Sequence, residues 1–219
     1  GLVQPDAELP RSAALDMMAW RLARASFGAN DIAGFEQLMT IGREANQAER
    51  FVAAEMAYRG ALGAQERMLG AGAPDTSGPM LRLALQLSNQ GRYPEADQLF
   101  NRAAPLAARA SDPMAPALLA HYIALHEANR GQPEKSLAEL DRAEALYARQ
   151  LPPGLRTGGG TRALVNAGGL DWGGLIADPL AQRALVGVVE AKRNRAVVLR
   201  SLGRVDEAAA EARTAEALA

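Results

Sequence analysis

The chain has 219 residues, which is enough for one or two ordinary domains or one short array of helical repeats. Its 24 basic and 25 acidic residues give a net charge of −1, and the absence of a basic excess argues against a nucleic-acid partner. The sequence has no cysteine and two histidines, so disulfides and thiolate metal sites are excluded. No apolar run approaches about 18 residues, and we therefore expect no transmembrane segment.

Helices are expected throughout, because 48% of the residues are hydrophobic, only 5% are aromatic, and the apolar residues are mostly alanine and leucine. Residues 1–30 are predicted to form an N-terminal arm and a capping helix, the helix running from Arg11 to Phe27. The chain begins with Gly1, so we expect a processed, trimmed or recombinant start, and an earlier signal peptide stays an open alternative. The cytoplasm and the periplasm are both compatible with this composition.

One pattern, centred on residues 81–103, recurs along the chain. The run LRLALQLSNQGRYPEADQLFNRA predicts two amphipathic helices separated by Gly91. Ala96, Phe100 and Ala103 follow at spacings that place them on one face of the second helix. A single helical hairpin cannot bury such a face, whereas a stack of hairpins can.

The pattern returns around three other turn residues. Glu49 precedes Gly91 by 42 residues, Gly131 follows it by 40, and Gly203 lies 72 residues beyond Gly131. These matches predict three repeats in residues 31–148 and a fourth helix pair in residues 180–219. They also predict that Ala54, Ala96 and Ala208 are buried where neighbouring hairpins meet. A plain helical bundle without repeats is the alternative.

A segment rich in glycine and proline, residues 149–179, interrupts the pattern. Segments of this length inside compact domains are usually functional or disordered. Trp172 is predicted either to fold over a binding groove as a lid or to anchor the segment to the outer surface. The run from Arg156 to Arg162 lacks the spacing of a phosphate-binding P-loop and reads as a flexible linker.

At these residues the chain resembles a tetratricopeptide repeat (TPR) protein. The matching positions, from the first helix through the turn to the second helix, are Leu83, Ala84, Gly91, Tyr93, Ala96, Phe100 and Ala103. The spacing of 40–42 residues and the run RAVVLRSLGR at 195–204 are similar to the kinesin-light-chain-like subclass. Departures occur at Arg195, where the family has leucine, at Pro133 and Val205, which replace the turn aromatic, and at Glu49, which replaces glycine. The resemblance implies an all-α, right-handed solenoid of antiparallel helix pairs.

The resemblance also implies a peptide-binding groove on the concave side, lined by exposed residues of the first helices. By register, these residues are Arg43, Asn46, Leu81, Leu85, Asn89, His121, Leu125, Asn129, Arg193 and Arg200. The three asparagines share one phase and are expected either to hold an extended peptide or to bond their own turns. The lysine and asparagine clamp that some family members use for acidic tails is absent.

Two further groups of polar residues are expected to be ordinary helix-surface features. His121 and His126 are five residues apart and therefore on different helix faces, which argues against a metal pair. A basic group in the last helix pair is predicted to form a solvated face balanced by nearby acids. Its members are Lys192, Arg193, Arg195, Arg200 and Arg204, and the acids are Asp206, Glu207 and Glu211.

The sequence therefore predicts a non-catalytic scaffold or adaptor that binds a protein or peptide segment, with no cofactor and no metal. Self-association is an open alternative. The array is also similar to the N-terminal regions of bacterial proteins that carry a caspase-like CHAT peptidase domain, which implies a regulatory recognition module as a second hypothesis. A third is a small-molecule sensor or hydrolase using the glycine-rich segment, although no recognisable catalytic motif supports it.

Overall fold

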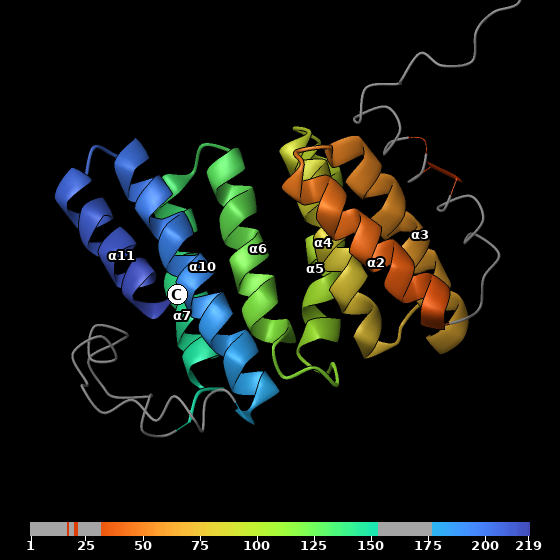
Figure 1. The fold of residues 1–219 in the computed structure, drawn as a ribbon. Helices are drawn as coiled ribbons and strands as arrows, with labels where there is room; N and C mark the ends of the chain where they lie inside the picture. The colour runs from red at the N-terminus through yellow and green to blue at the C-terminus, as the bar shows by residue number, and fades with distance from the viewer. Residues whose placement is uncertain (1–16, 18–19, 22–31, 153–176) are drawn as a thin grey trace, which may run out of the picture. The chain divides into compact units, whose positions relative to one another are not determined.

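The computed structural model describes residues 17, 20–21, 32–152 and 177–219, and within these residues the ordered elements are helices without strands. This confirms the predicted all-α class. The helices, in chain order (Figure 1), are α2 Ile32–Gln47, α3 Phe51–Leu69, the short 3-10 helix η1 Pro74–Thr76, α4 Ser77–Asn89, α5 Tyr93–Ala107, α6 Ala115–Asn129, α7 Pro133–Ala148, α10 Pro179–Ser201 and α11 Val205–Leu218. Most of the predicted arm and capping helix, and Trp172 with its glycine-rich segment, lie outside the described residues.

The chain divides into two compact units, unit 1 at residues 1–106 and unit 2 at residues 107–219. In unit 1, α2 packs against α3 and α3 against α4. In unit 2, α6 packs against α7, α7 against α10, and α10 against α11. Each of these helices thus packs against its neighbours in the sequence, as in a helical-repeat fold. The boundary between the units falls within residues 31–148, which the sequence pattern predicted as one block of three repeats.

The four predicted turn residues share one backbone conformation. Their φ angles are 57° at Glu49, 74° at Gly91, 71° at Gly131 and 73° at Gly203. In each turn the backbone N–H of the residue after the turn residue donates a hydrogen bond to the carbonyl five residues before it. The four N···O distances are 2.8 Å (Arg50–Ala45), 2.9 Å (Arg92–Leu87), 2.8 Å (Gln132–Glu127) and 2.9 Å (Arg204–Leu199). This bond closes a Schellman motif, in which a residue with positive φ ends a helix. The register predicted for Glu49 is therefore confirmed, although glutamate lacks the freedom of glycine.

Small residues allow the helices to approach closely. Ala54, Ala96 and Ala208 are buried as predicted. Glycine makes the tightest contacts: a Cβ atom on Gly42 of α2 would lie 2.5 Å from the ring of Tyr58 on α3. A Cβ atom on Gly187 of α10 would lie at the same distance from the ring of Tyr147 on α7. The aromatic rings therefore pack directly onto a neighbouring helix backbone.

Candidate functional site

The predicted groove residues of unit 1 divide between surface and interior. Arg43 on α2 is exposed, and Asn46 and Asn89 are half-buried. Leu81 and Leu85 on α4 are buried, because α4 is covered over most of its length and on more than one face. A partner cannot reach these two leucines in this conformation. Periodicity indicated an apolar stripe on α4 correctly, but it could not show that packing covers the opposite face too.

In unit 2 the predicted groove residues are mostly accessible. Asn129 on α6 and both Arg193 and Arg200 on α10 are exposed, and Leu125 is half-buried. His121 is the exception, since it is buried between three helices.

His121 joins α6 to α7 and α10 through both ring nitrogens. Its Nε2 lies 2.8 Å from Nδ2 of Asn194, and its Nδ1 lies 3.3 Å from the hydroxyl of Tyr147. The asparagine amide donates to Nε2, so the ring proton sits on Nδ1 and is directed to the tyrosine oxygen. Burial lowers the pKa of His121 to about 4, because the charged imidazolium would lose its hydration. His121 is therefore neutral near pH 7 and acts as a buried polar contact rather than as a groove residue.

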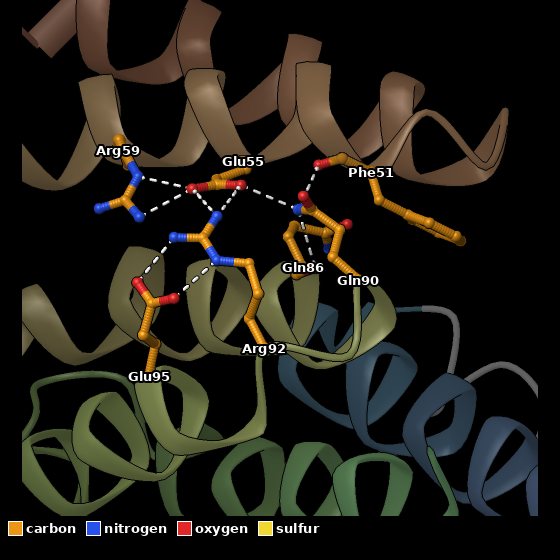
Figure 2. Close-up of polar contacts among 7 residues, drawn as sticks. All are labelled: Phe51, Glu55, Arg59, Gln86, Gln90, Arg92 and Glu95. Carbon is orange, nitrogen blue, oxygen red and sulfur yellow. Dashed lines mark hydrogen bonds and ion pairs between the residues drawn. The ribbon is translucent and has the colours of Figure 1, made fainter. Parts of the chain in front are cut away.

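A second polar group, the Glu55 network, ties α3 to the turn between α4 and α5 (Figure 2). The buried carboxylate of Glu55 accepts hydrogen bonds from Arg59 at 2.8 Å, from Gln90 at 2.9 Å and from Arg92 at 2.9 Å. Arg92 also forms an ion pair of 2.6 Å with Glu95, three residues further along α5. The network therefore connects residues more than 30 positions apart, between two successive helix pairs.

The electrostatics of Glu55 reflect two opposing effects. Burial alone raises its pKa, but hydrogen bonds from Gln90, Arg59 and Arg92 and the positive charge of Arg59 outweigh that effect, so the pKa is lowered. The repeat pattern in the sequence does not single out Glu55. A signal for this network was present in the sequence: an arginine follows the turn residue, and a glutamate follows that arginine by three positions. This spacing occurs at Arg92 and Glu95 and again at Arg204 and Glu207.

A third polar group, the Lys192 cluster, joins α7, α10 and α11 in unit 2. The ammonium of Lys192 lies 3.1 Å from a carboxylate oxygen of Glu144 and 3.0 Å from one of Glu211. Arg195 lies beside it, 3.2 Å from Glu144 and 3.6 Å from Glu211, and also forms an ion pair with Asp141.

This cluster corrects the predicted solvated basic face. Lys192 is buried and Arg195 is largely covered, whereas Arg193, Arg200 and Arg204 are exposed as predicted. The prediction failed for Lys192 because its partners include Glu144 on α7, which lies 48 residues earlier in the chain (192 − 144). A charge pattern within residues 180–219 could not indicate that neighbour.

The described residues contain no group of three or more histidine, aspartate or glutamate side chains arranged to hold a metal ion. Within the same part of the chain, no helix combines the length and apolar character needed to cross a bilayer. The three polar groups link helices to one another, so the chemistry they support is the positioning of helix surfaces.

No protein-family model matches the chain, and no curated protein matches it. The TPR relationship and the regulatory role beside a peptidase domain both stay predictions that rest on the residues described above.

Proposed function

We propose that this protein is a non-catalytic, TPR-like scaffold that binds a protein or peptide segment on the exposed faces of the first helices of its pairs. The observation that supports this most is the recurrence of one Schellman turn at Glu49, Gly91, Gly131 and Gly203. An array of like helix pairs stabilises itself through contacts between neighbours and presents a long, regular surface for recognition.

The exposed face of α10 has the composition that such recognition requires. Val186, Arg193, Val197 and Arg200 follow at spacings of seven, four and three residues, which places them on one helix face. The two valines are 62% and 68% exposed. Glu190 lies on the same face and pairs with Arg193 at 2.9 Å, so the exposed valines together with Arg200 favour a peptide that places an acidic side chain beside apolar ones.

The test is selection from a library of displayed random peptides against the full chain and against the variant Val197→Glu/Arg200→Glu. Both positions are exposed, so the fold should be retained, and the variant should lose the peptides that the parent chain enriches. Arg213→Glu, an exposed position on α11 outside the predicted surface, is the control and should retain them. Equal enrichment by the double variant, or no enrichment by the parent chain, would contradict the proposal.

A further inference from the structure

A hollow of about 420 Å³ opens in unit 1 where α3 begins. Its lining is mainly apolar, with Phe51, Val52 and Met56 from the first turns of α3 and Gln90 from the end of α4. Figure 2 shows the ring of Phe51 directed away from the Glu55 network, while its carbonyl accepts a hydrogen bond from Gln90. The residues of the predicted groove do not line this hollow, so it is a separate surface.

Arg50 lines the hollow beside Phe51, and its guanidinium has no acceptor among the described residues. It forms no side-chain hydrogen bond or ion pair with the described residues, and its Nη1 is covered by protein without a partner. Covered N–H groups are nearly always satisfied, because an unpaired one forfeits the hydrogen bonds it made to water. A ligand cannot reach the covered Nη1, but Nε and Nη2 of Arg50 are not covered, so the position of Arg50 favours a ligand that brings a negatively charged acceptor to these two atoms.

Two of the three other turns, those at Gly91 and Gly203, show which acceptor belongs there. Arg92 and Arg204 stand at the same position after their turn residues, and each pairs with a glutamate three residues later at 2.6 Å. Three residues after Arg50 the chain has Ala53, and the first turn of α3 contains no acidic residue. At the hollow, the first turn of α3 thus lacks the carboxylate that pairs with the arginine in the turns at Gly91 and Gly203, and no other described residue supplies one.

We propose that this hollow binds a segment of a partner protein in which a glutamate or aspartate side chain follows a bulky apolar residue. The partner's carboxylate pairs with Arg50 as Glu95 pairs with Arg92, and the apolar side chain contacts Phe51, Val52 and Met56. Glu55 does not compete for Arg50, because Arg59, Arg92 and Gln90 already hold its oxygens. Exposed Glu49, also in the lining, repels a polyanion such as phosphate more strongly than it repels a single carboxylate, so a singly charged side chain is the better fit.

The experiment is an NMR titration of the full chain with the capped peptide acetyl-Gly-Leu-Glu-Gly-amide and its neutral counterpart acetyl-Gly-Leu-Gln-Gly-amide. The glutamate peptide should shift the Arg50 Nε–H and Met56 methyl signals and bind about tenfold more tightly than the glutamine peptide, as expected when one charge-assisted hydrogen-bonded pair is gained. Arg50→Gln should abolish that difference. Arg213→Gln, the same change of charge at an exposed position in unit 2, should leave it intact.

Several results would overturn the proposal. These are an absence of shifts at the two signals, equal affinities for the two peptides, or unchanged discrimination in Arg50→Gln. Tighter binding of N-acetyl-leucine than of the glutamate peptide would assign the hollow to a free carboxylate instead and would also refute it. If Arg50→Gln does not fold, Val52→Glu serves in its place, since this exposed position should repel the glutamate peptide selectively. The scaffold proposal is tested on α10, so either proposal can fail without the other.

Discussion

Each unit joins its own helices through a polar cluster, and the buried group is negatively charged in unit 1 and positively charged in unit 2. In unit 1 the covered group is the carboxylate of Glu55, and its partners Arg59 and Arg92 have side chains that are 45% and 38% exposed. In unit 2 the covered group is the ammonium of Lys192, whose side chain is 6% exposed and lies between Glu144 and Glu211. If Glu55 is removed, water can hydrate the exposed arginines of unit 1. If Lys192 is removed, Glu144 and Glu211 are less accessible to water, because their side chains are 14% and 24% exposed. We therefore expect unit 2 to be the more sensitive to loss of its central charge.

The largest expected effect is that of Lys192→Met. Removing one member of a buried ionic cluster leaves its partners uncompensated, so the free energy of unfolding should fall by about 3 kcal/mol, with Arg195 moderating the loss. Urea unfolding followed by circular dichroism measures this change. Arg193→Met, at the next position on the exposed side of α10, should cost less than about 0.5 kcal/mol, since surface ion pairs contribute little. Equal effects of the two substitutions would refute the assigned burial.

The second expected effect is a dependence on pH that separates the two units. The pKa of His121 is lowered by burial from 6.5 to about 4, so between these values the unfolded chain binds a proton that the folded chain does not. The contribution of neutral His121 to the free energy of unfolding is therefore complete above 6.5, its pKa in the unfolded chain. It is lost as the pH falls towards about 4, its pKa in the folded chain. Between about pH 7 and pH 5 unit 2 should lose about 2 kcal/mol of stability.

Hydrogen exchange of the α10 and α3 amides distinguishes this effect from a general loss of structure. Protection of α10, corrected for intrinsic exchange, should fall between about pH 7 and pH 5 while that of α3 stays constant. The pKa of Glu55 is lowered from 4.5, so its own contribution to unit 1 is complete above 4.5 and disappears only at lower pH. His121→Gln should remove the dependence in α10, and its persistence in that variant would show another group to be responsible.

A smaller effect is expected for Glu55→Gln. The substitution retains the shape and one acceptor oxygen but removes the charge, while the exposed arginines gain hydration. The stability of unit 1 should decrease by about 1 kcal/mol, the size of one net hydrogen bond, when measured by urea unfolding. The variant should also lose the part of the dependence on pH below 4.5 that Glu55 contributes, whereas the part from Glu95, whose pKa the hydrogen bond from Arg92 lowers, should remain. A loss as large as that of Lys192→Met would mean that the two clusters do not differ in the way proposed.

The smallest effect is a gain in stability from Glu49→Gly. Glu49 has a φ of 57°, and relief of a left-handed strain of roughly 1–2 kcal/mol is partly offset by the larger chain entropy of glycine. We expect a net stabilisation of about 0.5 kcal/mol in thermal unfolding. Gly91→Ala makes the reverse change in the next turn and should destabilise it. If glycine at position 49 were destabilising, the four turns would not be equivalent.

How far the sequence predicts this molecule differs from feature to feature. The turn at Glu49 could be placed because alanine and aromatic positions after it match those after Gly91, even though the glycine itself is missing. Leu81, Leu85 and His121 were assigned to an open surface, and they are buried. A helical period shows which residues share a face, but it does not show how many faces of a helix neighbouring helices cover.

What the sequence by itself determined is the set of helix pairs, their turns and the buried alanine positions, because short-range backbone geometry and the spacing of small residues specify them. The tertiary structure alone decided which polar side chains are enclosed and with which partners. Glu55 meets Arg92 across 37 positions, and His121 meets Asn194 across 73. Contacts over such separations depend on which helices pack together. The packing therefore decides how deeply each polar side chain is buried and which charge lies beside it.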